Sequence, residues 1–243
     1  QIYCAMEGYY GMATAFMVKY VVMFIIFGAF LERSGAGKFF IDLAFALTRR
    51  AVGGPAKAAV TGSCLMGSIS GSGVANVMMV GTFTIPMMKK VGYKPHVAAA
   101  IEAAGSNGGQ IMPPVMGSVA FIMAEFTGIP YAKIALASAL PALMYYMTVY
   151  TYVHLQARKT GIRVSEDQSI PTAKQVLREG WIYFTPLVVL VAFIGMGYTP
   201  NRAGFAGIVT MVLASQLKKK NRMNLKNILE AMVLGGRYTL AIG

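Results

Sequence analysis

The chain alternates long apolar runs with short segments of polar and basic residues. Several of these runs approach the roughly 20 residues that an α-helix needs to cross a lipid bilayer. They cover residues 12–31, 131–156, 181–196 and 204–217. The pattern predicts an all-α polytopic membrane protein. Composition supports this class, because 56% of the residues are hydrophobic and only 13% are charged, whereas about 25% are charged in ordinary soluble domains.

The stretch from residue 53 to residue 88 predicts a helical hairpin rather than a single crossing. Two apolar halves, each short for a spanning helix, are joined by Ser70-Gly71-Ser72-Gly73. Arg49-Arg50 precede the stretch, and Lys89, Lys90 and Lys94 follow it. Basic segments favour the cytoplasmic side. We therefore expect residues 51–92 to form a re-entrant hairpin. Its tip would lie at membrane depth, where irregular backbone must be buried in protein or line a cavity.

Residues 93–128 predict one crossing with an unwound middle. A helical pattern runs to Ala104 and breaks at Gly105-Ser106-Asn107-Gly108-Gly109. It resumes through Ile111-Met112-Pro113-Pro114 and continues apolar to Phe126. Interrupted helices of this kind form ligand sites near the bilayer midplane in secondary transporters. The sequence therefore predicts a discontinuous transmembrane helix here.

The remaining segments complete the expected architecture. We expect a scaffold helix and an interfacial arm in residues 1–50, a transmembrane helix in 129–160, a cytoplasmic connector in 161–180 and further transmembrane helices in 181–243. This topology places 18 of the 22 Lys and Arg residues on the cytoplasmic side, as the positive-inside rule requires. Because Gln opens the chain and an apolar stretch closes it, we expect a fragment at both ends.

Neutral oxygens gather at the two breaks and suit a coupling cation such as sodium, which unwound backbone carbonyls also coordinate. The expected cation-binding residues are Ser70, Ser72, Asn76, Gly105, Ser106, Asn107, Gly109 and Pro113. Half-helix N-termini would face an anionic substrate group at Ser72, Gly73, Asn107 and Gly108. Glu102 lies one turn before the second break, and as an intramembrane carboxylate it is a candidate proton relay.

Helix packing is the alternative interpretation of the same breaks. Gly67 and Gly71 have the GxxxG spacing of close helix contacts, and so do Gly105 and Gly109. Either break alone fits packing as well as it fits ligand binding. Together, each with Ser and Asn beside its glycines, the two breaks favour a binding site.

The sequence lacks the residues of an enzyme. It contains no G-x-S-x-G, H-E-x-x-H, C-x-x-C or phosphate-binding loop motif, and His96 and His154 are expected at the cytoplasmic edge, away from the serines. The net charge of +13 does not indicate nucleic acid, because the basic residues form short clusters between apolar runs. We expect no catalytic residue, no cofactor and no metal centre, and membrane lipid and a small molecule as partners.

A long central run resembles one known transporter family. Residues 67–117 read GSISGSGVANVMMVGTFTIPMMKKVGYKPHVAAAIEAAGSNGGQIMPPVMG. This run is similar to the large membrane subunit of tripartite ATP-independent periplasmic (TRAP) transporters, and especially to the fused permeases that work with TAXI-type binding proteins. The flanking runs FGAFLERSGAGKFFIDLA and MAEFTGIPYAKIALASALPALMYYMTVY resemble the same subfamily.

The resemblance implies an elevator-type transporter of the ion transporter superfamily in the bacterial inner membrane. Such a permease takes up a carboxylate with a sodium or proton gradient, after delivery by a periplasmic TAXI-type binding protein. The hairpin tip, Ser70 to Asn76, and the loop Gly105 to Pro114 would share a sodium site, and this chain would hold the first inverted repeat and the start of the second. Relatives often have serine where Gly73 stands and threonine where Asn107 stands.

Two other functions stay open from the sequence. One is a stand-alone carboxylate or ion exchanger of the same superfamily that works without a binding protein. The other is a structural membrane subunit that packs through its glycines and binds no ligand.

Overall fold

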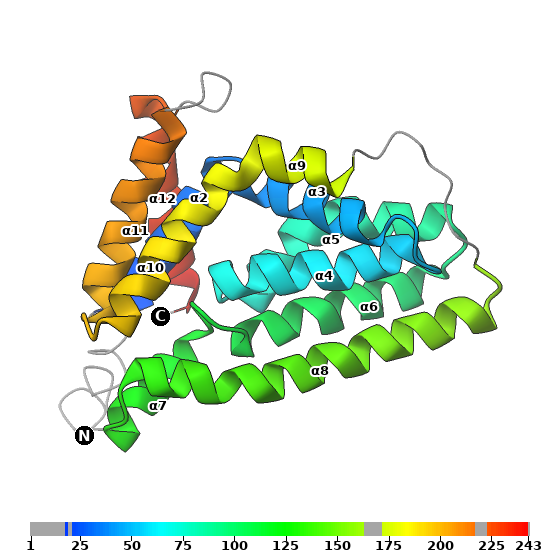
Figure 1. The fold of residues 1–243 in the computed structure, drawn as a ribbon, viewed down its shortest axis with the longest axis horizontal. Helices are drawn as coiled ribbons and strands as arrows, with labels where there is room; N and C mark the ends of the chain where they lie inside the picture. The colour runs from blue at the N-terminus through cyan, green and yellow to red at the C-terminus, as the bar shows by residue number, and fades with distance from the viewer. Residues whose placement is uncertain (1–17, 19–20, 163–171, 217–222, 243) are drawn as a thin grey trace. The chain divides into compact units, whose positions relative to one another are not determined.

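A computed structural model of the chain describes residues 18, 21–162, 172–216 and 223–242 (Figure 1). Within these residues, all regular structure is helical. The elements are α2 (Val22–Arg33), α3 (Ala36–Thr48), α4 (Gly54–Ser70), α5 (Gly73–Lys90), α6 (Pro95–Gly108), η2 (Gly109–Ile111), α7 (Ser118–Thr127), α8 (Tyr131–Lys159), α9 (Ala173–Gly180), η3 (Trp181–Phe184), α10 (Thr185–Gly195), α11 (Pro200–Gln216) and α12 (Leu225–Ile242). The start of the first expected crossing, part of the expected connector and the lysines at 218–220 lie outside the described residues.

The chain forms two compact units. The first comprises residues 1–35, 117–136 and 182–243. In it, α2 packs against α11 and α12, and α10 packs against α11. The ring of Phe27 lies where a side chain on Gly207 would stand, so a glycine in α11 lets α2 approach closely. Phe121 of α7 stacks on Tyr131 with a ring centroid distance of 4.5 Å.

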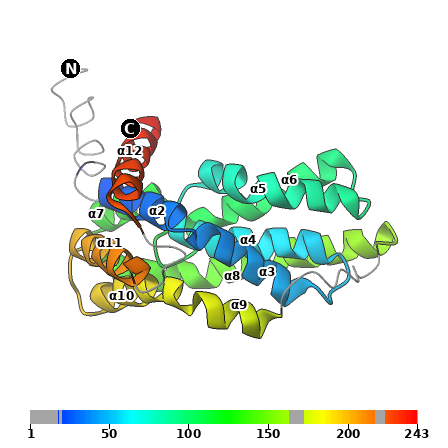
Figure 2. The ribbon, with the colours of Figure 1, turned by 90° about the horizontal axis from the view of Figure 1, so that it is seen from above.

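The second unit comprises residues 36–116 and 137–181 and holds the predicted hairpin. Helices α4, α5 and α6 pack pairwise, and α3 packs against both α4 and α9. Figure 2 shows α5 and α6 running side by side. The ring of Phe39 in α3 occupies the space beside Gly180 at the end of α9. The hairpin therefore packs against helices from both earlier and later in the chain.

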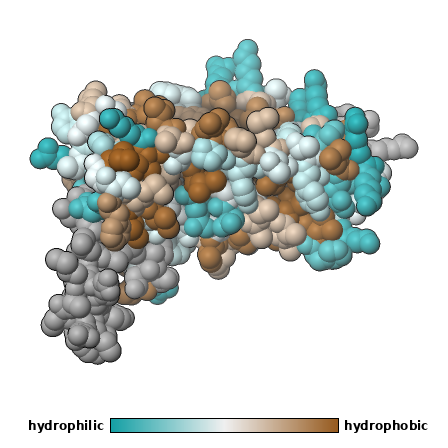
Figure 3. Space-filling view, turned by 90° about the horizontal axis from the view of Figure 1, so that it is seen from below, coloured by the Kyte–Doolittle hydropathy of each residue, from teal (hydrophilic) through white to brown (hydrophobic). Residues whose placement is uncertain are grey.

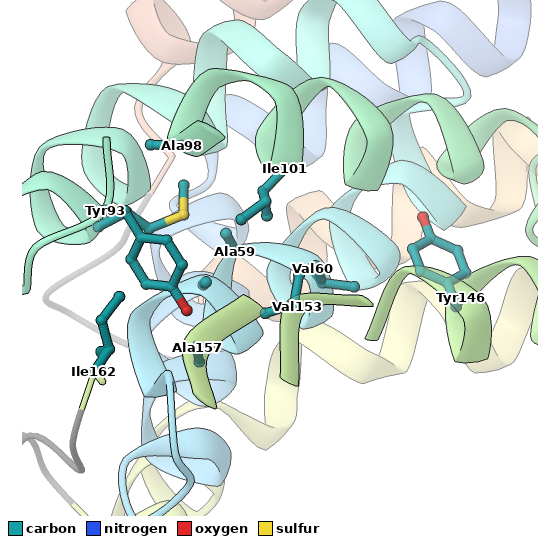
Figure 4. Close-up of a cluster of buried hydrophobic side chains, with 11 residues drawn as sticks. Ala59, Val60, Tyr93, Ala98, Ile101, Tyr146, Val153, Ala157 and Ile162 are labelled. Atoms are coloured by element: carbon teal, nitrogen blue, oxygen red, sulfur yellow. The ribbon is translucent and has the colours of Figure 1, made fainter. Parts of the chain in front are cut away.

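Small side chains allow close helix packing in the core of the second unit. Ala56, Ala59 and Val60 of α4 meet Ala157 of α8 in a buried cluster (Figure 4), and small residues allow this close helix contact. The Tyr93 ring, from the turn after α5, fills the same cluster. Burial raises the pKa of Tyr93 to about 12, so its hydroxyl is neutral at physiological pH.

The predicted helical hairpin is present, with a tip close to the expected one. Helix α4 ends at Ser70 and α5 begins at Gly73. Gly71 has a φ of 62°, a left-handed conformation that favours glycine at the end of a helix. Ser72 caps α5, because its Oγ accepts a hydrogen bond from Ala75 N at 3.3 Å. Glycine and serine at the tip thus have local structural roles.

The interruption after α6 lies later than the sequence predicted. Helix α6 continues through the expected break and ends at Gly108. A short 3-10 turn follows, then non-helical residues 112–117, so the helix does not resume at residues 111–114 as expected; it resumes only with α7. The reason lies at Gly105, which packs against Val60 and Ser63 of α4 and serves close helix contact rather than unwinding.

Two helical stretches are long and apolar enough to span a bilayer, namely Tyr131–Lys159 and Ala173–Gly195; Ser118–Thr127 is a shorter apolar helix. They overlap the crossings expected at residues 131–156 and 181–196, but the second begins at Ala173, within the segment expected to be a connector. Large apolar side chains of α8 remain exposed, and Leu136 is 79% exposed. In the view of Figure 3, hydrophobic side chains lie exposed among polar ones. An exposed apolar surface of this kind suits lipid contact better than water contact.

Candidate cation and substrate site

The hairpin tip and the end of α6 lie against each other. A Cβ added at Gly73, the first residue of α5, would lie 3.6 Å from Asn107 Cα. In the last turn of α4, Gly67 is in direct backbone contact with Gly109, the first residue of η2. The non-helical segment also returns to α4, where Val115 N donates to Ser68 O at 3.1 Å. The two breaks predicted from sequence therefore meet in the fold.

A buried carboxyl group joins the three helices behind this contact. Glu102 of α6 is fully buried. Ser63 of α4 donates to its Oε1 at 2.9 Å, and Ser106 of α6 donates to the same oxygen at 3.0 Å. Thr84 of α5 contacts Oε2 at 2.5 Å. Glu102 thus holds α4, α5 and α6 together through hydroxyl groups, which supplies the hydrogen bonds that a buried carboxyl group needs.

Within the described part of the chain, Asn76 of α5 has an acceptor without a hydrogen-bond partner. Its side chain is fully buried, and its Nδ2 donates to Ser63 O at 2.9 Å. Among the residues that the structure describes, no donor reaches Asn76 Oδ1. An unsatisfied buried acceptor is unfavourable by about 1–3 kcal/mol, and such groups are rare in folded proteins. A buried acceptor of this kind needs a further partner.

The expected ligand side chains have different partners. Ser70 Oγ lies 3.5 Å from Ser72 O, within the tip turn. Ser106 Oγ also lies 3.4 Å from Ser63 Oγ. Asn107 Oδ1 accepts from Gln110 Nε2 at 3.0 Å. A serine hydroxyl that donates one hydrogen bond keeps lone pairs that can coordinate a cation, so these contacts do not exhaust the hydroxyl oxygens.

The structure also shows the surroundings of the backbone positions expected in the site. Gly105 O accepts from Tyr146 of α8 at 2.9 Å. Gly108 lies under the Tyr145 ring. Pro113 belongs to the non-helical segment after η2, and the Pro113–Pro114 peptide bond is cis.

An open hollow of about 450 Å³ adjoins the tip. It is lined by Gly73, Val74, Val77, Ala103, Ala104, Asn107 and Gln110. Gly73 and Asn107, two of the four residues expected to contact substrate, therefore face one hollow. The Gln110 amide occupies the space beside Gly73, since a Cβ there would lie 2.6 Å from Gln110 Nε2.

Sequence reasoning missed Ser63, Thr84 and Gln110. Ser63 and Thr84 lie within apolar helical runs, away from the glycine-rich breaks, and reach Glu102 from 39 and 18 residues away in the chain. Gln110 directly follows the second break. Its polar side chain in an apolar stretch was the one sequence feature that could have identified it.

The described residues form an all-helical fold with exposed apolar helices, which fits a polytopic membrane protein. Residues 4–243 match the tripartite ATP-independent periplasmic transporter family, DctM component. Because the match covers nearly the whole chain, the chain belongs to this family of transporter permeases. The expectation of a transport protein rather than an enzyme is therefore confirmed.

Several curated proteins are similar to the chain. An uncharacterised protein of Salmonella typhimurium is 27% identical over 94% of the chain and 53% of its own length. The 2,3-diketo-L-gulonate TRAP transporter large permease protein of Escherichia coli is 25% identical over 79% of the chain and 45% of its own length. The C4-dicarboxylate TRAP transporter large permease protein of Pseudomonas aeruginosa is 25% identical over 91% of the chain and 52% of its own length. The chain thus spans about half the length of the relatives it matches.

Proposed function

We propose that this protein is the permease component of a secondary active TRAP transporter that imports an organic acid, with sodium as the coupling ion. It works as a multi-pass protein of the bacterial inner membrane and receives its substrate from a periplasmic TAXI-type binding protein. Three findings support the proposal: the family match, relatives named for 2,3-diketo-L-gulonate and C4-dicarboxylates, and the similarity of residues 67–117 to the fused permeases.

The α4–α5 hairpin is re-entrant in this proposal and moves with α6 as one body of an elevator. Helix α4 has 17 residues and α5 has 18, which gives each a length of about 26 Å, shorter than the roughly 30 Å hydrocarbon core. The ends of the hairpin carry Arg49-Arg50 and Lys89-Lys90, which favour the cytoplasmic side. The hydroxyl contacts of Glu102 support a common motion of all three helices.

The observation that carries the cation site is the unpartnered Asn76 Oδ1 in the part of the chain that the structure describes. A sodium ion beside it would satisfy this oxygen. The remaining ligands are drawn from Ser70, Ser72, Ser106 and Asn107 and from the carbonyl groups of Gly105, Gly109 and Pro113. No fixed carboxylate is required, and a neutral oxygen shell releases its ion more readily than a charged one does.

The substrate carboxylate binds beside the tip, where the hollow of about 450 Å³ meets the first residues of α5. Its volume is within the range of small-molecule sites. The N-terminus of α5 at Gly73 attracts negative charge through the N–H groups of its first turn and through the helix dipole. Ser72 and Asn107 supply hydrogen bonds there. Gly73 lines the hollow together with Asn107, whereas Gly108 lies under the Tyr145 ring.

Sodium-dependent thermal stability of the purified full-length protein tests the cation site. Sodium chloride should raise the melting temperature more than choline chloride does, since a ligand at 100 times its dissociation constant stabilises by about 2.7 kcal/mol. Asn76→Ala should abolish the sodium-specific rise. The matched control on α5 is Thr82→Ala, because Thr82 is exposed and donates to Met79 O of its own helix. Equal sodium responses of Asn76→Ala and Thr82→Ala would refute the site.

Proton coupling at Glu102 is the second candidate, favoured by the full burial of this carboxyl group among three hydroxyls. It predicts uptake that depends on a pH gradient and not on sodium. Glu102→Gln removes the exchangeable proton and keeps the shape of the side chain. If Glu102→Gln loses uptake and uptake by the wild type does not depend on sodium, the proton is favoured over sodium as the coupling ion.

A further inference from the structure

Two adjacent tyrosines of α8 hold the end of α6 by its backbone. Tyr145 donates to Ala104 O at 2.8 Å, and Tyr146 donates to Gly105 O at 2.9 Å. Their rings meet edge to face, with centroids 5.8 Å apart and an interplanar angle of 88°. Figure 4 shows the Tyr146 side chain extending from α8 beside the buried cluster. Consecutive residues of one helix thus bind consecutive carbonyls of another.

The carbonyl that Tyr146 binds is one that the end of α6 leaves free. In a regular α-helix, Gly105 O would accept the N–H of Gly109. Here the Gly109 N–H turns toward Ser106 O and Asn107 O instead. A buried carbonyl released from the helix needs another donor, and the Tyr146 hydroxyl is that donor.

The rings fix the same segment from the side. A Cβ added at Gly108 would lie 2.6 Å from Cδ1 of Tyr145 and 3.1 Å from Cζ of Tyr146. Tyr146 is only 8% exposed and belongs to the buried cluster with Val153 and Ala157 of its own helix. The last turn of α6, with Ser106 and Asn107, is therefore held between the α4–α5 hairpin and a rigid aromatic pair.

We propose that Tyr146, assisted by Tyr145, is a positioning residue for the coupling ion. The pair contacts no ligand itself. It sets where α6 ends, and therefore where Asn107 lies against Gly73 at the hairpin tip. This inference rests on the proposed sodium site and adds α8 to the elements that determine its affinity.

Tyrosine-to-phenylalanine variants test this role because they remove one hydroxyl and keep the ring. The measurement is the sodium concentration that gives half of the sodium-specific rise in melting temperature of the full-length protein. Y146F should raise this midpoint by roughly three- to tenfold, the effect of losing one hydrogen bond. Y145F should raise it less, because Tyr145 is less buried. Y152F is the matched control on α8, since Tyr152 is 55% exposed, and should keep the wild-type midpoint.

The outcomes separate positioning from mere stability. A purely structural role would lower the melting temperature without sodium and leave the midpoint unchanged, and that result in Y146F would overturn the inference. If the Y146F protein does not fold, the sodium midpoint of Y145F is the test. A Y145F midpoint above that of Y152F supports the inference, and equal midpoints overturn it. A wild type without any sodium-specific response would instead refute the proposed sodium site, and this inference with it.

Discussion

The backbone contact between Gly67 and Gly109 yields a quantitative prediction for Gly67→Ala. A Cβ on Gly67 would overlap the Cα of Gly109, and no side-chain rotation can relieve a clash with backbone. Overpacking of this kind is unfavourable by about 1–3 kcal/mol, and we expect the upper end here. Alanine recovers up to about 1 kcal/mol through its better helix propensity. The net loss is therefore about 2 kcal/mol.

Gly62→Ala is the control in the same helix. A Cβ there would lie 3.5 Å from Ala44 Cβ and 3.7 Å from Val80 Cγ1, which are ordinary contacts. We expect this variant to be neutral or slightly stabilised. With about 2–4 °C per kcal/mol in a protein of this size, thermal unfolding in detergent should place Gly67→Ala about 4–8 °C below wild type. Melting temperatures of Gly67→Ala and Gly62→Ala within about 2 °C of each other would refute the argument.

Two further predictions concern topology and the buried carboxyl group. With the native cysteines replaced, Arg50→Cys and Lys90→Cys should both react with a membrane-impermeant thiol reagent only from the cytoplasmic side. Ile129→Cys, between α7 and α8, should react only from the outside. Labelling of position 50 or 90 from the outside would show that the hairpin is a full crossing. Glu102→Ala should destabilise the protein by roughly 2–5 kcal/mol, because it leaves a cavity and removes an acceptor that three hydroxyl groups share. Glu102→Gln should retain most of the stability in the same thermal assay, and equal losses would contradict this prediction.

The sequence was sufficient to predict the hairpin. Its tip combines a glycine that can adopt a positive φ with a serine that caps the next helix, and both effects depend on neighbouring residues only. Local patterns of this kind are visible in a single sequence. The ends of α4 and α5 consequently lie close to the predicted ones.

The second break was predicted too early in the chain, because a glycine can either interrupt a helix or allow close contact with another helix. Gly105 looked like the start of an unwound loop, but the structure uses it for contact with α4. Which use applies depends on Ser63, a residue far away in the chain. The same limit hid the tyrosine pair, since Tyr146 meets Gly105 across 41 residues. Tertiary partners of polar groups do not follow from periodicity.

Binding of radioactive sodium by the purified full-length protein tests the central claim most directly. The account predicts saturable binding to the wild type and a large loss of affinity in the double variant Ser72→Ala/Asn107→Ala, with membrane insertion unchanged. The two residues come from the tip and from the end of α6, which lie in contact, so together they probe whether both breaks form one site. A double variant that binds sodium as tightly as the wild type would contradict the account.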